Sequence, residues 1–221
     1  MQRIDKENIL ALNYKEWIDK IESNNEIHPG YSSKHEYYLD IVANLLWVQK
    51  GLCAYTEMML FDPTDLSPDK WVNGTFPEKF KFFSHLEHYD ESLKKSKGYL
   101  WSNLFVAHSD INTKNKGSKK VNYILKPDLD NYDPFFLLQY DFRIHLFFPN
   151  SDREEDLQTK ILEDINVLGL NFQPVVQQRK KKLNVLIESV RLKQKTLAEA
   201  RSELFEFYTS FEMTIKSLGI I

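Results

Sequence analysis

The chain contains a single cysteine, Cys53, among its 221 residues. One thiol excludes an internal disulfide framework and is typical of a reducing compartment. Long apolar runs are missing too: none approaches the ~20 residues that a membrane-spanning helix needs, and the opening MQRIDKENI lacks the apolar segment of a signal peptide. We therefore expect a cytoplasmic protein with no membrane partner.

Glycine is scarce, with seven residues, which favours helices. The sequence also has no P-loop, no G-x-G-x-x-G and no G-x-S-x-G, so it does not support nucleotide hydrolysis, dinucleotide binding or serine-hydrolase chemistry. What remains is typical of a folded chain, with 42% hydrophobic and 14% aromatic residues. We predict one domain over residues 1–221, of the α+β class and mainly helical.

One stretch carries residues suited to chemistry on a phosphodiester, HLEHYDESLKKSKGYLWSNLFVAHSDINTKNKG (85–117). It places the acid Glu87 beside His88 and then continues to Asn103 and Asn112. Histidine can act as a general base near neutral pH, and hard oxygen ligands can hold a divalent cation beside the phosphate. Alternation along a strand would put Glu87 and His88 on opposite faces, so we expect His88 to point toward water. An amide at Asn103 could orient the histidine or tie the loop to the helix. The set is that of a one-metal nuclease hairpin.

The order EH, W-x-N-L and S-D-x-N-x-x-x-K-G resembles the motif of the HNH (ββα-metal) nucleases. LLWVQKGLCAY upstream, with KPD, INVLGLN and QQRKKKL downstream, is similar to the HNH proteins of Septu and retron anti-phage systems, over roughly residues 40–190. The resemblance implies that Glu87 and Asn112 bind Mg²⁺ or Mn²⁺, that His88 is the general base, and that Asn103 is the organising amide. It also implies an ATPase partner protein. DNA and RNA remain equal candidates for the substrate.

The chain departs from these relatives at their structural zinc, which is usually held by two C-x-x-C pairs. The corresponding positions here are Cys53 with Thr56, and His108 with Ile111. A closed zinc site needs four nitrogen or sulfur ligands, so we expect no structural zinc and a frame held by packing instead. His85, on the same face as Glu87, is expected beside the site as a further ligand or a supporting partner, and His108 is a second candidate for the supporting role.

Positive charge is concentrated around the motif although the whole chain has a net charge of −3. Between Ser92 and Lys126 there are eight lysines and one acid. A local basic surface can neutralise phosphates, and the alternative is a solvated loop that only aids solubility. The lysines that we expect to contact nucleic acid are Lys94, Lys95, Lys97, Lys114, Lys116, Lys119 and Lys120.

Periodicity and turn residues predict the elements around this core. Helices are expected at about 6–23 and 34–49, the second with a capping box of Ser33 and Glu36. A loop over 61–81 leads to a first hairpin strand in KFFSHLEHYD, and a second strand lies within 101–106. A hairpin of 135–140 with 143–148 precedes helices at 152–168, 174–195 and 196–217. The HNH core would span about 51–120, with a helical scaffold from 1–50 and 151–221.

Two functions follow, from different classes. The first is a metal-dependent HNH endonuclease, the effector of an anti-phage complex, which the retention of Glu87, His88, Asn103 and Asn112 favours. The second is a catalytically inactive HNH-fold module that binds nucleic acid or a partner.

Overall fold

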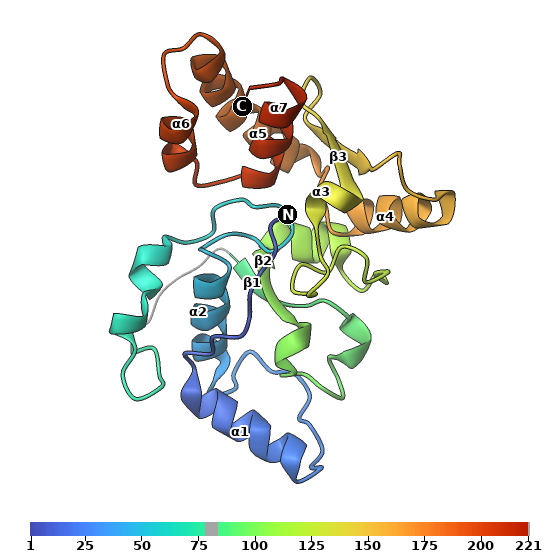
Figure 1. Ribbon diagram of the computed structural model, residues 1–221. Coiled ribbons are helices and arrows are strands. Elements are labelled where there is room, and N and C mark those ends of the chain that lie inside the picture. The colour runs from blue at the N-terminus through green and yellow to red at the C-terminus, as the bar shows by residue number, and fades with distance from the viewer. Residues whose placement is uncertain (78–83, 221) are drawn as a thin grey trace.

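The computed structural model describes residues 1–77 and 84–220 and has a mixed α and β architecture (Figure 1). Helices surround two small antiparallel hairpins, β1 with β2 and β3 with β4. The elements in chain order are α1 (Leu12–Ser23), α2 (Tyr38–Val48), η1 (Pro63–Leu66), η2 (Pro68–Lys70), β1 (Ser84–His88), η3 (Glu91–Leu93), η4 (Trp101–Asn103), β2 (Leu104–His108), η5 (Ile111–Lys116), α3 (Pro134–Leu137), β3 (Leu138–Asp141), β4 (Leu146–Pro149), α4 (Glu155–Val167), α5 (Gln173–Arg191), α6 (Leu197–Glu203) and α7 (Tyr208–Ser217).

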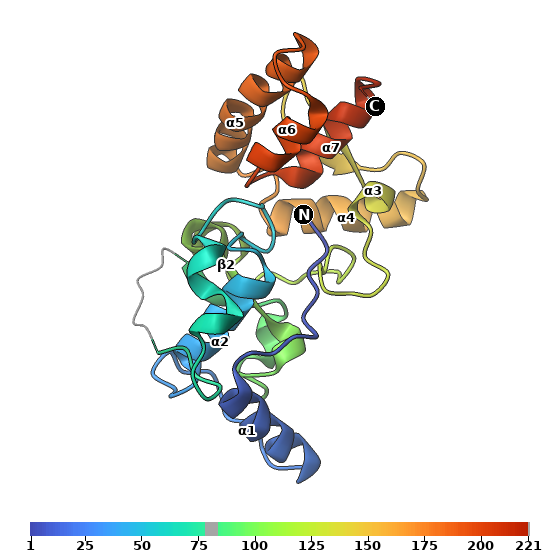
Figure 2. The ribbon, with the colours of Figure 1, turned by 60° about the vertical axis from the view of Figure 1, so that its left-hand side comes forward.

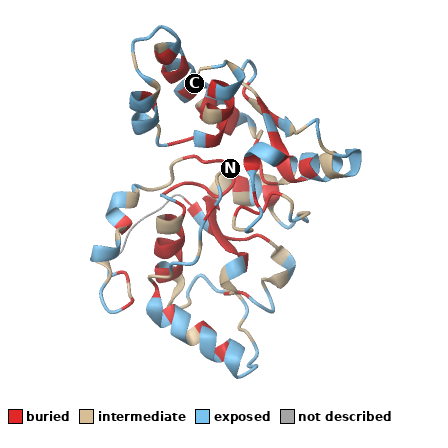
Figure 3. Ribbon diagram, viewed as in Figure 1, coloured by how far each residue is buried: buried red, intermediate tan, exposed pale blue. Residues whose placement is uncertain are grey.

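The β1–β2 hairpin lies between two groups of buried residues. Glu87 pairs with Phe105 and His88 with Leu104, so neighbours along each strand face opposite ways. Leu104 packs with α1 and α2, whereas Phe105 packs with the cluster that includes α4, α5 and α7. Figures 1 and 3 show the buried strands with α1 and α2 on one side and α4 to α7 on the other. The hairpin is therefore an interior element on both faces.

Helix α1 begins at Leu12, later than the predicted residue 6. The first ten residues run extended between the two groups of buried residues, from the group that includes α4, α5 and α7 to the start of α1, as Figure 2 shows. The Met1 amino group pairs with Glu57 at 2.9 Å. The amide oxygen of Asn44, on α2, accepts hydrogen bonds from the backbone N–H of Leu10 and Ala11. A side chain from another helix therefore satisfies the donors just before α1 begins, which local sequence signals do not reveal.

Helix α2 begins at Tyr38, and the predicted capping box of Ser33 with Glu36 is wrong. Tyr37 precedes the helix and makes no side-chain cap. Ser32 instead accepts from the backbone N–H of Lys34 and helps to close a turn in the segment before α2. The predicted strand in KFFSHLEHYD is present over Ser84–His88, and its first residues lie outside the described ranges.

The second hairpin and the C-terminal helices follow the prediction in order and type but differ in several bounds: β4 begins at Leu146 and α4 at Glu155, each three residues later than predicted. Residues 134–137 form a helical turn because Pro134 occupies its first position and Asp133 caps Phe135, so β3 starts only at Leu138. The predicted helix 196–217 is two helices, α6 and α7, separated at Phe207, which has a positive φ of 59°. Within the two described ranges, no helix combines the length and apolarity needed to cross a membrane.

Candidate functional site

The motif residues lie on the hairpin β1–β2 and on the helical turn η5 that follows it. η5 is π-helical, with the backbone N–H of Gly117 donating to the carbonyl of Asn112, five residues earlier. Asn115 fixes this turn to α4 by donating to the carbonyls of Asn166 and Val167 at 2.6 and 2.8 Å. The C-terminal end of α4 thus holds η5 against the hairpin.

Glu87 and Lys116 form a buried ion pair at the centre of this arrangement. Their side chains are almost inaccessible, with residue exposures of 2% and 1%, and Glu87 Oε1 lies 2.5 Å from Lys116 Nζ. The contact is a close charge pair without the alignment of a good hydrogen bond, and the ammonium also donates to the His88 carbonyl at 2.8 Å. Burial raises the pKa of Glu87 to about 7 although Lys116 opposes the shift.

His88 faces the other side of the hairpin and is buried, with 1% exposure. Its Nε2 lies 2.9 Å from the carbonyl oxygen of Gly98. Its ring and the Tyr31 ring pack edge to face, with their centroids 4.9 Å apart. A carbonyl only accepts, so Nε2 carries the proton and Nδ1 keeps its lone pair. Burial lowers the pKa of His88, which keeps the ring neutral. The expectation that His88 points toward water is wrong for this structure.

A short segment, residues 29–31, covers the loop that holds His88. Tyr31 donates its backbone N–H to the carbonyl of Lys94, and Gly98 donates to the carbonyl of Pro29. A Cβ on Gly98 would lie 2.3 Å from the Tyr31 nitrogen, so only glycine permits this approach. The Gly98 residue, whose carbonyl accepts from His88 Nε2, is therefore itself held in place by residues 29–31.

Asn103 ties the loop after β1 to the start of β2. Its side-chain oxygen accepts from the Asp90 N–H at 2.8 Å, and its amide nitrogen donates to the Asp90 carbonyl at 3.0 Å. Tyr89 donates to the backbone carbonyl of Asn103 as well. Both side-chain groups are thereby occupied. Asn103 was predicted either to orient His88 or to tie the loop to the helix. These contacts give no support for the first role, and they tie the loop to strand β2 instead of to the helix.

Among the described residues, no hydrogen bond or ion pair joins Glu87 to the other predicted metal and supporting residues. His85 is exposed, and His108 uses Nδ1 to accept from the Asp110 N–H at 3.2 Å. Asn112 is half-buried, and its side chain makes no hydrogen bond to another described residue. No cluster of three or more His, Cys, Asp or Glu residues suited to a metal occurs over residues 1–77 and 84–220. Since Glu87, the carboxylate of the predicted donor set, already faces an ammonium, this donor set does not fit a divalent metal ion.

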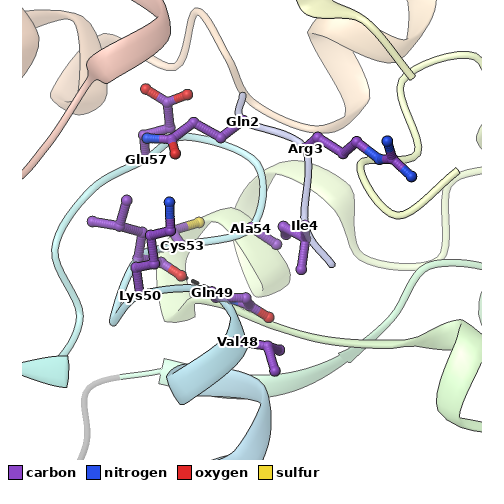
Figure 4. Close-up of a pocket in the computed structure, with 10 residues that line it drawn as sticks. Gln2, Arg3, Ile4, Val48, Gln49, Lys50, Cys53, Ala54 and Glu57 are labelled. Carbon is purple, nitrogen blue, oxygen red and sulfur yellow. Dashed lines mark hydrogen bonds between the residues drawn. The ribbon is translucent and has the colours of Figure 1, made fainter. Parts of the chain in front are cut away.

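The positions that align with zinc ligands of the HNH proteins that the motif resembles are packed into the interior. Cys53 and Ile111 belong to the same hydrophobic cluster, Thr56 is buried, and the Cys53 sulfur accepts from the His108 backbone N–H at 3.4 Å. Figure 4 shows Cys53 and Glu57 beside a small cavity of about 20 Å³. That volume holds about one water molecule. These side chains therefore pack against one another, and the absence of a structural zinc stays a prediction.

The lysines of the basic stretch differ in exposure, and Lys116 and Lys126 are buried. Lys95, Lys97, Lys119 and Lys120 are exposed; Lys94 is half-buried and pairs with Glu91, and exposed Lys114 pairs with Asp110. Lys116 cannot reach a phosphate because its ammonium is buried against Glu87, so its assignment to the nucleic-acid surface is wrong.

A hollow of about 440 Å³ opens beside two of the exposed lysines. We call it the Tyr123 hollow, and its lining residues are Tyr89, Asp90, Glu91, Ser92, Ser118, Lys119, Lys120, Val121 and Tyr123. The loop after β1 forms one wall, and the segment after η5 forms the other.

Asp164 positions this second wall, and the sequence interpretation missed it. The carboxylate is buried on α4 and accepts from the backbone N–H groups of Asn122, Ile124 and Leu125 at 2.7, 3.2 and 3.3 Å. Burial raises the pKa of Asp164, and these three donors oppose the shift. A signal was available, because Asp164 interrupts the apolar stripe of Ile161, Ile165 and Leu168 on one helix face.

The likeness to HNH proteins rests on the motif residues alone. A scan of protein-family models and a search of curated proteins both give no match to this chain.

Proposed function

We propose that this chain is a nucleic-acid-binding module built on a hairpin of the HNH type, the second of the two functions that its sequence suggests. The observation that carries the proposal is the Glu87–Lys116 pair. The chain's own ammonium neutralises the carboxylate that a metal-dependent nuclease would need, while other lysines around the hairpin stay exposed.

The exposed lysines supply the binding chemistry. The side-chain ammonium groups of Lys95, Lys97 and Lys120 have no hydrogen bond or ion pair within the described part of the chain, so they are available to phosphates. Lysine binds phosphate as a point charge without reading bases. Affinity should therefore depend steeply on salt and little on base sequence.

Nuclease activity is a second candidate because of one observation at His88. Its Nε2 proton is held by the Gly98 carbonyl, and its Nδ1 lone pair is unclaimed by the described residues, which is the state that a general base requires. The ring would have to become accessible first, by displacement of Tyr31 and residues 29–30. The ATPase partner and the role in phage defence belong to this candidate and rest on the resemblance.

The test measures binding and cleavage in one preparation. Fluorescence anisotropy should show the wild type binding labelled DNA and RNA strands at low salt, with a log–log slope against salt of about −0.7 per phosphate contacted. Incubation of the same complexes with Mg²⁺ or Mn²⁺ should leave the strands intact. Addition of Mn²⁺ should also leave the melting temperature unchanged, because residues 1–77 and 84–220 offer no cluster of ligands for the ion.

The matched variants are His88→Ala and Lys116→Met. Manganese-dependent cleavage by the wild type that falls by about 10² to 10⁴ in His88→Ala would establish the nuclease and overturn the proposal of a purely binding module. Absence of binding to any strand at low salt would overturn both candidates. If Lys116→Met gains stabilisation by Mn²⁺ that the wild type lacks, the ammonium is what excludes the metal.

A further inference from the structure

The Tyr123 hollow presents an aromatic ring beside positive charge. The residue Tyr123 is 41% exposed and lies in the wall of the 440 Å³ space, with Lys119 and Lys120 in the same lining. A space of this size lies within the range of small-ligand pockets, about 300 to 1,000 Å³, and so suffices for one nucleotide. Serine hydroxyls at Ser92 and Ser118 add neutral hydrogen-bonding groups.

The Tyr123 ring is held in place from three sides. Its hydroxyl donates to Asp90 Oδ2 at 2.5 Å, and its ring packs against the Tyr89 ring at 5.3 Å with a tilt of 58°. Its backbone has a positive φ of 60°, which a tyrosine rarely adopts. Asp164 pins the residues on both sides of it, Asn122 and Ile124. Such an enforced conformation costs free energy and is common at binding sites.

The two acids in the lining leave it with a net positive charge, because Glu91 is paired with Lys94 and the single charge of Asp90 is outweighed by the two of Lys119 and Lys120. Asp90 accepts from Ser92 with Oδ1 and from Tyr123 with Oδ2. Glu91 pairs with Lys94 at 3.0 Å. Lys119 donates to the Asn115 carbonyl at 2.6 Å, which leaves its charge uncompensated, and Lys120 has no bond to another described residue. The hollow therefore combines a rigid ring with two cations that an anion can reach.

We propose that the Tyr123 hollow binds one unpaired nucleotide of a single strand, with the base stacked on Tyr123 and its phosphate beside Lys119 and Lys120. A base within a duplex is stacked on both faces and cannot offer one to a side chain, whereas an unpaired base can. The inference rests on the proposed nucleic-acid binding and narrows it to single strands or unpaired positions.

The test compares a single strand with its duplex. Tyr123→Asn removes the ring but tolerates the positive φ, and Tyr123→Phe keeps the ring without the hydroxyl. Loss of one stacked base should weaken single-strand binding by about 5- to 150-fold, because stacking on an aromatic side chain contributes about 1 to 3 kcal/mol. Duplex binding should change by less than about twofold, since the lysines remain. Tyr123→Phe should stay near wild type on both.

Tyr208 on α7 provides the matched control, because it is similarly exposed at 38% and does not line the hollow. Tyr208→Asn should leave both affinities unchanged. An equal loss for single strand and duplex in Tyr123→Asn, or no loss in either, overturns the inference while the proposed function stands. Wild type that binds no strand at all refutes the proposed function itself.

A measurement on the wild type covers the case in which Tyr123→Asn does not fold. Strands that carry 5-bromouracil are irradiated in complex with the protein, and the adducts are mapped by mass spectrometry. The expected adduct is at Tyr123 in the single-strand complex and is absent from the duplex complex. Adducts confined to other aromatic residues would contradict the proposal.

Discussion

The centre of the β1–β2 hairpin and the Tyr123 hollow lie close together in the chain but differ in what their polar groups do. At the centre, Glu87, His88 and Asn103 are buried, and their polar groups contact Lys116, Gly98 and Asp90. In the hollow, Lys120 and the face of Tyr123 meet solvent. The residues that carry the nuclease resemblance therefore stabilise the fold, whereas less conspicuous neighbours offer binding chemistry.

The difference has a physical basis in burial on two faces. An isolated two-stranded hairpin would leave one face open to substrate, but here helices and loops cover both. Polar groups in such an environment must find partners inside the protein, because an unpaired charge is costly there. Polar groups that are paired inside the protein in this way are unavailable to a ligand.

Replacement of Lys116 by methionine should give the largest effect. It leaves Glu87 buried without its counter-ion, and breaking such a pair typically lowers the free energy of unfolding by about 3 to 5 kcal/mol. The loss should be greater at pH 8 than at pH 6, because the isolated carboxyl can take up a proton at the lower pH. Urea unfolding at both values measures it.

Lys114→Met is the control, since Lys114 lies on the same turn but is exposed and pairs with Asp110. It should change stability by about 0.5 kcal/mol or less. Equal losses for the two variants would show that the Glu87–Lys116 contact does not hold the hairpin.

Lys6 should make the free energy of unfolding depend on pH in the alkaline range. Its buried ammonium donates to the carbonyls of Trp101 and Leu104 and pairs with Asp128 at 3.2 Å; burial lowers its pKa from 10.5 to about 7. Above pH 7 the unfolded chain holds more protons at this residue than the folded chain, so its contribution to stability rises with pH, by on the order of 1 kcal/mol per unit. Lys6→Met should lack this rise between pH 7 and 9.5, as measured by urea unfolding. A slope unchanged by the substitution would contradict the assignment.

Asn103→Ala should have an intermediate effect. It removes two hydrogen bonds to Asp90 and leaves backbone groups without partners, at a cost of about 1 to 3 kcal/mol. Asn112→Ala should be nearly neutral, within about 0.5 kcal/mol, because its side chain has no such bonds to described residues. Thermal unfolding of the two variants measures both losses. A larger loss of stability in Asn112→Ala than in Asn103→Ala would overturn this account of the hairpin.

The double variant with Lys119→Ala and Lys120→Ala should give the smallest change in the free energy of unfolding. Stability should stay near wild type, and the slope of log affinity for a single strand against log salt should become shallower by about 1.4, two contacts at about 0.7 each. Lys180→Ala with Lys181→Ala, exposed on α5, is the control with the same charge change. An equal change in slope for both pairs would mean that binding is spread over the whole surface.

The sequence predicted those elements whose signals are local. The helix after Pro174 is α5, Gly169 follows the end of α4, and the strand containing Glu87 and His88 turns them to opposite faces. These features depend on glycine, proline and alternation within a few residues. Boundaries set from a distance were missed, such as the start of α1, which depends on Asn44.

The site was harder to predict because its contacts join distant parts of the chain. Lys116 reaches back 29 positions to Glu87, and nothing in a run of lysines marks which one is buried. His88 matches a catalytic motif, but its burial depends on Tyr31, far upstream. Residue identity gave the type of chemistry available, and tertiary packing decided which groups can use it.

The π-helical geometry of η5 makes the hairpin centre sensitive to a change of a single codon. Each residue advances a regular helix by about 100°, so deletion of one residue between Ile111 and Lys116 would rotate the ammonium away from Glu87. The carboxylate would then be left without its internal cation, free to accept one from solution.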